Sequence, residues 1–198
     1  MGKLIALEGI DGSGKSTQAR RLGAALRARG IDAVVFREPG DSQAGDKLRE
    51  QFRHGRTITP QQEADLFIAD RRIDVRDNIV PALAAGRVVV MDRYYFSTMA
   101  YQGALGLDVE ELRRENESFA PRPHLTLILD VPPETSAHRI VAARVRPSSY
   151  EDVDYLAKVR KLFLSFCSGD IIALDATTPE DDLAAEILTE VYAVLDRE

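Results

Sequence analysis

Residues 9–16 read GIDGSGKS and fit the pattern G-x-x-x-x-G-K-[ST] at every position. This pattern is typical of a loop whose backbone N–H groups surround the phosphates of a nucleotide. The flanks agree, because residues 3–7 form an apolar run suited to a buried strand and residues 16–29 carry apolar side chains at helical spacing. We therefore expect a strand, a phosphate-binding loop and a helix in that order.

The pattern also assigns chemistry to single side chains. Lys15 can reach the β- and γ-phosphates of a triphosphate, and the Ser16 hydroxyl is placed to ligate Mg²⁺. The residues that we expect to hold the triphosphate are Gly9, Ile10, Asp11, Gly12, Ser13, Gly14, Lys15, Ser16 and Thr17.

Apolar runs that resemble strands recur at 3–7, 33–36, 88–91, 125–129 and 171–174, with helical patterns between them. This alternation predicts an α/β fold, a doubly wound five-stranded parallel sheet flanked by helices in three α/β/α layers. Helix starts are expected at Thr59-Pro60 and Thr178-Pro179, each with a capping box, and at Pro132-Pro133; Gly86 should end the helical stretch that begins at Thr59. The sequence contains no repeat or linker, so we expect one domain over 1–198.

Charge and composition limit the partners. A net charge of −6 disfavours a general nucleic-acid binder. Cys167, the single cysteine, cannot form an internal disulfide, and the first residues lack a secretory signal pattern. No apolar stretch reaches the ~20 residues that cross a bilayer. We expect a cytoplasmic protein without a membrane or nucleic-acid partner.

Polar residues follow two of the expected strands. Asp92 and Arg93 come after 88–91, and Arg37, Glu38, Pro39 and Gly40 come after 33–36. Ligands of open α/β sheets gather at the carboxyl ends of the strands, so Asp92 could hold Mg²⁺ through water and Arg93 could bind a phosphate. The alternatives are a surface ion pair for Asp92-Arg93 and a simple chain reversal at Pro39-Gly40.

Phe67 and Arg71 are four residues apart and share one face of the helix expected after Thr59. An aromatic ring beside a guanidinium can stack on a base and hydrogen-bond its edge. The competing interpretation places Phe67 in the ordinary core.

Five segments together resemble the thymidylate kinase family of P-loop nucleoside monophosphate kinases. They are EGIDGSGKSTQ at 8–18, REPG at 37–40, LFIADR at 66–71, DRYYFSTMAYQG at 92–103 and LILDVPPE at 127–134. The resemblance covers essentially the whole chain. It implies transfer of the ATP γ-phosphate to dTMP, giving dTDP and ADP in dTTP biosynthesis, with Mg²⁺ as cofactor and a homodimer as the assembly.

The resemblance also implies roles for single residues. Phe67 would stack on thymine, Arg71 would read its edge, and Tyr101 would close the space that a ribose 2′-hydroxyl needs. The residues expected to bind the acceptor nucleotide are Asp11, Arg37, Glu38, Phe67, Arg71, Arg93, Ser97, Tyr101 and Gln102, and those expected to hold Mg²⁺ are Ser16 and Asp92.

No general base is expected, because a nucleoside monophosphate is already an anionic nucleophile. The expected catalytic residues are Lys15, Arg93, Arg144 and Arg146, the last two in a short lid at about 139–151. We expect Arg139 to bind ATP by stacking on adenine, and the alternative for Arg139 is a structural role. The alternative for this segment is an exposed helix end whose cations favour the helix dipole.

Asp41-Ser42 stands where the family commonly has Gly-Thr, which would place an additional acid near the acceptor phosphate. This pair keeps open a kinase for another pyrimidine monophosphate. The lid has Ser148-Ser149 where the family often has Asp-Arg, and this departure keeps open a nucleotide-binding homologue with weak turnover. No function is assigned to His124, which stands where the pattern often has Asp.

Overall fold

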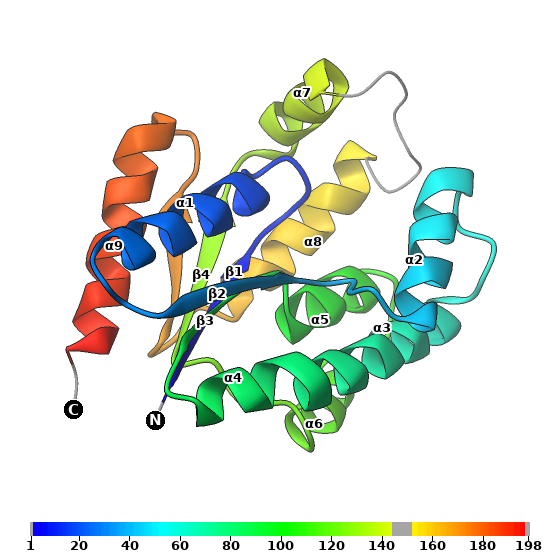
Figure 1. The fold of residues 1–198 in the computed structure, drawn as a ribbon. Helices are drawn as coiled ribbons and strands as arrows, with labels where there is room; N and C mark the ends of the chain where they lie inside the picture. The colour runs from blue at the N-terminus through cyan, green and yellow to red at the C-terminus, as the bar shows by residue number, and fades with distance from the viewer. Residues whose placement is uncertain (1, 144–151, 197–198) are drawn as a thin grey trace.

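The computed structural model describes residues 2–143 and 152–196. Five parallel strands form one sheet in the order β2-β3-β1-β4-β5 (Figure 1). Their bounds are β1 Lys3–Glu8, β2 Ala33–Arg37, β3 Val88–Asp92, β4 Leu125–Asp130 and β5 Ile171–Asp175. The predicted α/β fold is confirmed. Each strand extends one residue beyond the predicted apolar run, because backbone pairing continues through a charged residue at its carboxyl end.

Helices cover both faces of the sheet, as the three-layer prediction requires (Figure 1). On one face lie α1 and α9; on the other lie α4, α5 and α8, with α3 beside α5. The helix bounds are α1 Lys15–Ala28, α2 Gln43–His54, α3 Pro60–Asp74, α4 Val80–Ala84, α5 Tyr95–Gly103, α6 Val109–Glu117, α7 Pro133–Ala143, α8 Val153–Ser165 and α9 Glu180–Leu195.

Helix starts and ends match the sequence signals with one exception. Thr59 forms the predicted capping box with Gln62, α7 begins at Pro133, and Gly86 follows α4 with a φ of 79°. The capping box predicted at Thr178 is wrong. Its hydroxyl instead donates to the Asp175 carbonyl at 2.8 Å, so that α9 begins at Glu180 without a side-chain cap.

The helical stretch predicted after Thr59 changes its pitch before Gly86. A π-helical turn, Val75–Ile79, lies between α3 and α4, and the Val80 N–H bonds the carbonyl of Val75, five residues back. Pro81 follows at once and has no N–H to continue an ordinary ladder. The helical stretch therefore continues through the π turn into α4.

Strand register brings two of the predicted segments together. Leu7 of β1 is paired with Asp92 of β3, so the two strands end at the same level. The loop after β1 and the Asp92-Arg93 segment therefore leave the sheet side by side. Within the described part of the chain, no helix has the length and apolar character needed to cross a membrane.

Candidate active site

The loop between β1 and α1 has the backbone that the glycine pattern requires. Gly9 has a φ of 135°, and a Cβ there would lie 2.5 Å from the Leu129 carbonyl oxygen. Gly14, with a φ of 97°, forms the N-cap of α1 without a side-chain hydrogen bond. The loop therefore passes close to β4 and leaves the first N–H groups of α1 available to an anion.

Lys15 begins α1 and folds back over the loop. Its buried ammonium donates to the Ile10 carbonyl at 2.7 Å and to Ser13 Oγ at 3.4 Å. Burial, helped by the positive charge of Arg93, lowers the pKa of Lys15 to about 7. A bound polyphosphate would favour the charged form again, so this ammonium is suited to a phosphate ligand.

Arg93 is held in an uncommon backbone conformation at the end of β3. Its φ of 72° lies in the left-handed region, and its N–H donates to the Leu7 carbonyl at 3.0 Å. The guanidinium bonds Asp11 and, at 3.0 Å, Ser97 Oγ. Non-glycine residues adopt this conformation rarely and often at functional sites.

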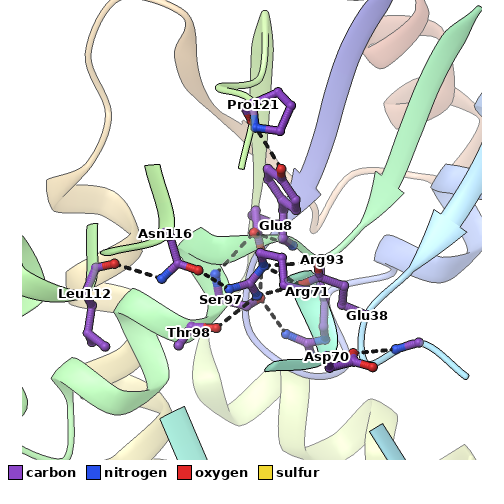
Figure 2. A network of polar contacts seen from close by, with 12 residues as sticks. Glu8, Glu38, Asp70, Arg71, Arg93, Ser97, Thr98, Leu112, Asn116 and Pro121 are labelled. Atoms are coloured by element: carbon purple, nitrogen blue, oxygen red, sulfur yellow. Dashed lines mark hydrogen bonds and ion pairs between the residues drawn. The ribbon is translucent and has the colours of Figure 1, made fainter. Parts of the chain in front are cut away.

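Glu8, a residue not predicted to have a role, organises the start of α5. Its buried carboxylate accepts hydrogen bonds from the Tyr94 N–H at 2.8 Å, the Ser97 N–H at 3.1 Å and Ser97 Oγ at 2.5 Å (Figure 2). Burial raises the pKa of Glu8, and the hydrogen bond from Ser97 opposes that rise. Since Ser97 also contacts Arg93, Glu8 fixes the surroundings of that guanidinium.

Arg71 points into the molecule and is fully buried. Its Nε donates to both carboxylate oxygens of Glu38, at 3.0 and 2.9 Å, and Nη2 donates to Glu38 and to Thr98 Oγ1 (Figure 2). Nη1 donates to Asn116 Oδ1, which leaves one of its N–H groups without a partner among the described residues. Arg71 is thus a fixed group that retains a single donor for a ligand.

A pocket opens beside this network, with about 790 Å³ of space not filled by protein atoms, its mouth included. All nine residues expected to bind the acceptor line it, although their binding role stays a prediction. The lining residues are Asp11, Arg37, Glu38, Pro39, Phe52, Glu63, Phe67, Arg71, Arg93, Tyr94, Ser97, Tyr101 and Gln102.

Two lining residues suit a planar heterocycle. Phe67 is half-buried in the pocket wall rather than in the core, with its ring centroid 6.2 Å from that of Phe52. Gln102 is fully buried, and neither polar atom of its amide has a hydrogen-bond partner within the described chain. Buried amides are normally paired, so this one is available to a ligand.

The remaining predicted residues surround the loop. Asp92 is buried at the end of β3, with its Oδ2 3.8 Å from Nε of the largely exposed Arg37. Arg139 of α7 donates to the Ala176 carbonyl at 3.0 Å and to the Gly12 carbonyl at 3.4 Å. Ser16 is exposed and Thr17 half-buried in the first turn of α1. Arg144 and Arg146 lie outside the described residues, as does most of the predicted lid.

Comparisons with known proteins agree with this geometry. A model of the family described as thymidylate kinase matches residues 7–187. The chain is 44% identical over 193 residues to a probable thymidylate kinase of Archaeoglobus fulgidus, covering 98% of this chain and 96% of that protein. The chain belongs to the thymidylate kinase family. It is also 42% identical over 195 residues to the thymidylate kinase of Desulfotalea psychrophila, with 98% and 96% covered.

A third relative shows the same extent of similarity. The thymidylate kinase of Xylella fastidiosa strain M12 is 41% identical over 194 residues, with 98% of this chain and 88% of that protein covered. Family membership makes the chain a dTMP kinase that uses ATP. The phosphate-binding loop and the pocket beside it are the two parts that such a reaction needs.

The Asp41-Ser42 departure from the family pattern does not reach the pocket. The Asp41 side chain is fully exposed, 3.9 Å from Arg49 Nη2, and does not line the cavity. Ser42 caps α2 by accepting the Gly45 N–H at 3.0 Å and donates to Asp70 at 2.5 Å. Because α2 begins here, Asp41 points outward, and the structure does not place its carboxylate in the pocket.

Sequence reasoning missed several residues that shape the site. Glu8 ends β1 as Asp92 ends β3, and this shared position at a strand end could have identified it. Phe52 and Glu63 carry no local signal beyond their places on helices. Thr98 and Asn116 contact Arg71 from 27 and 45 residues away, and only the tertiary fold brings them there.

Proposed function

We propose that the pocket binds dTMP with its base between the Phe67 wall and the amide of Gln102, and with its phosphate directed toward Arg93 and Arg37. The observation that carries this assignment is the unpaired buried amide of Gln102 in the same pocket as a half-buried aromatic ring. An amide presents one acceptor and two donor hydrogens, which complements the mixed donor and acceptor edge of thymine. The single unpaired N–H of Arg71 would donate a second hydrogen bond to the edge of the base.

Tyr101 is proposed to face the sugar. It lines the pocket, and its hydroxyl accepts the Asp11 N–H at 2.9 Å, which fixes the ring beside the phosphate-binding loop. Burial raises the pKa of Tyr101, so the hydroxyl stays neutral at physiological pH. A ring fixed in this way can exclude a 2′-hydroxyl by occupying its space.

The reaction needs alignment more than acid–base chemistry. An oxygen of the dTMP phosphate attacks the γ-phosphorus of ATP, the bond from that phosphorus to the β–γ bridging oxygen breaks, and its electron pair leaves with ADP. Since the nucleophile is already anionic, no side chain has to remove a proton. Lys15 would stabilise the negative charge on the transferred group, and Arg93 would hold the attacking phosphate.

Mg²⁺ is part of the proposal. No group of three or more His, Cys, Asp or Glu side chains that could hold a metal ion occurs in the described residues. Ser16 and Asp92 supply a hydroxyl and a carboxylate, which suits a Mg²⁺ ion that takes its other ligands from water and phosphate. When bound, the ion would neutralise charge on the phosphates of ATP.

A homodimer and a cytoplasmic location belong to the same proposal. Support for an interface comes from Ile73 of α3 and Val80 of α4, which are apolar and 39% and 45% exposed. Measurement of the molar mass in solution tests the assembly, and a monomeric mass at micromolar concentration would contradict it.

The function is tested by the rate of ADP release with dTMP, dUMP, UMP and dCMP as acceptors. We expect dTMP to give the highest kcat/KM and EDTA to abolish turnover. A higher value for another pyrimidine monophosphate would favour the alternative substrate. Absent turnover with ATP still bound would favour the weak homologue.

A further inference from the structure

The last turn of α5 ends on a carbonyl that the helix itself does not satisfy. The amide of Leu105 bonds the Gln102 carbonyl at 3.0 Å instead of that of Tyr101. The Tyr155 hydroxyl, from the first turn of α8, donates to the Tyr101 carbonyl at 2.9 Å. Terminal carbonyls of helices need such partners when they are buried. Tyr155 therefore closes the end of the helix that carries Tyr101 and Gln102.

The same hydroxyl is held from its other side. Arg56 Nη2 donates to Tyr155 Oη at 3.4 Å, and the guanidinium carbon lies 5.5 Å from the centre of the Tyr155 ring. Arg56 Nε donates to Glu63 Oε2 at 2.7 Å, and Glu63 is a buried residue of the pocket wall. Burial raises the pKa of Tyr155, so its hydroxyl is a proton donor at neutral pH.

These contacts form a continuous chain around the pocket, which we call the Tyr155 bridge: Glu63, Arg56, Tyr155, Tyr101 and Asp11. It joins α3 to α8, α8 to α5, and α5 to the phosphate-binding loop, and α8 contacts α5 (Figure 1). Tyr155 is the only member of the bridge that comes from α8. It does not line the pocket, so any effect on the substrate must pass through Tyr101.

We propose that Tyr155 is a positioning residue that holds the last turn of α5 and thereby sets the discrimination between deoxyribose and ribose acceptors. The inference rests on the proposed function, because it needs Tyr101 to face the sugar. The physical reason is that steric exclusion of one hydroxyl depends on where the excluding ring lies to within a fraction of an ångström. A carbonyl without its partner lets that turn relax.

Tyr155→Phe tests the proposal with the smallest change. It removes the hydroxyl and keeps the ring, whose centroid lies 6.1 Å from that of Tyr101 in an edge contact. A hydrogen bond contributes about 1 kcal/mol. We therefore expect the ratio of kcat/KM for dTMP to that for its ribose counterpart to fall about 3- to 10-fold. The KM for ATP should not change.

Tyr192→Phe is the matched control. Tyr192 lies on α9, and its buried hydroxyl has no hydrogen-bond partner in the described chain. This variant loses a tyrosine hydroxyl, as Tyr155→Phe does, and should keep the parent preference for deoxyribose over ribose acceptors. Arg56→Met should shift selectivity in the same direction as Tyr155→Phe. The double variant should change it by less than the sum of the two, since both act on one hydroxyl.

The outcomes separate the two hypotheses. Tyr101→Ala should itself lower the ratio; if it does and Tyr155→Phe does not, Tyr155 has no positioning role. If Tyr101→Ala keeps the parent ratio, the assignment of Tyr101 to the sugar is wrong. If Tyr155→Phe raises the KM values for ATP and dTMP equally and lowers the Tm, its role is structural and the proposal is overturned.

Discussion

Replacing Gln102 by Met should stabilise the ligand-free protein and weaken the binding of dTMP. Gln102 is completely buried, and its Oε1 and Nε2 lack partners within the described residues. An unsatisfied buried polar group costs about 1–3 kcal/mol. Met has a similar length and no strong polar group, so Gln102→Met should raise the free energy of unfolding by about 2 kcal/mol. For a domain of this size, that corresponds to a rise in Tm of about 4–8 °C.

Binding should change in the opposite direction. If the amide reads the thymine edge with two hydrogen bonds of about 1 kcal/mol each, kcat/KM for dTMP should fall about 30-fold. The KM for ATP should stay near its original value. Calorimetric unfolding with and without dTMP, together with steady-state kinetics, measures both effects. The stabilisation that dTMP gives the parent protein should largely disappear in the variant.

Gln18→Met is the control for a buried glutamine outside the pocket. Its Nε2 donates to the Glu180 carbonyl at 3.0 Å, and it does not line the cavity. The variant loses this bond but also removes Oε1, which has no partner among the described residues, so the Tm should rise less than in Gln102→Met and the KM for dTMP should not change. A lower Tm for Gln102→Met, or an unchanged KM for dTMP, would refute the reasoning, because the amide would then be structural.

Three further perturbations test other parts of the site. Lys15→Ala should abolish transfer while the protein remains folded, and near-normal turnover would refute the assignment of the phosphate-binding loop. Phe67→Ala should weaken the binding of dTMP by about 1–3 kcal/mol and the binding of ATP much less, and titration of the protein with each nucleotide measures both effects. His124 accepts the Leu4 N–H on Nδ1 at 3.0 Å, and burial lowers its pKa. The unfolded chain therefore binds more protons than the folded one, so the free energy of unfolding should fall as the pH drops below about 6.5. This fall should be smaller in His124→Asn than in the control variant His54→Asn, which changes an exposed histidine.

The strands could be predicted because burial on both faces selects apolar residues. The same rule explains why each predicted strand ended one residue too early. Each strand ends on a charged side chain at the edge of the sheet, where ligands of such sheets bind. Thr178 shows the limit of a local capping signal. Its hydroxyl had a competing acceptor, the Asp175 carbonyl, and the sequence pattern does not contain that information.

Within the site, the sequence predicted which residues meet but not how their bonds are distributed. The spacing of Phe67 and Arg71 on one helix face was correct. The Glu38 and Asn116 partners of Arg71 come from a strand end and from a distant helix, which no local pattern connects. The carboxylate of Glu8 was missed because its role arises from the packing of β1 against the start of α5.

The buried Arg71 and the half-buried Arg93 have different tasks in the pocket, and their bonds explain why. Arg71 is almost saturated by Glu38, Thr98 and Asn116, so it can recognise a base edge only through one fixed N–H. Arg93 has an uncommon φ of 72°, a conformation that costs about 1–3 kcal/mol outside glycine. Two hydrogen bonds hold this conformation. The Arg93 N–H donates to the Leu7 carbonyl, and the N–H of the following Tyr94 donates to the Glu8 carboxylate. In this conformation the guanidinium bonds Asp11 and Ser97 Oγ beside the phosphate-binding loop, which is where the proposed function places the acceptor phosphate.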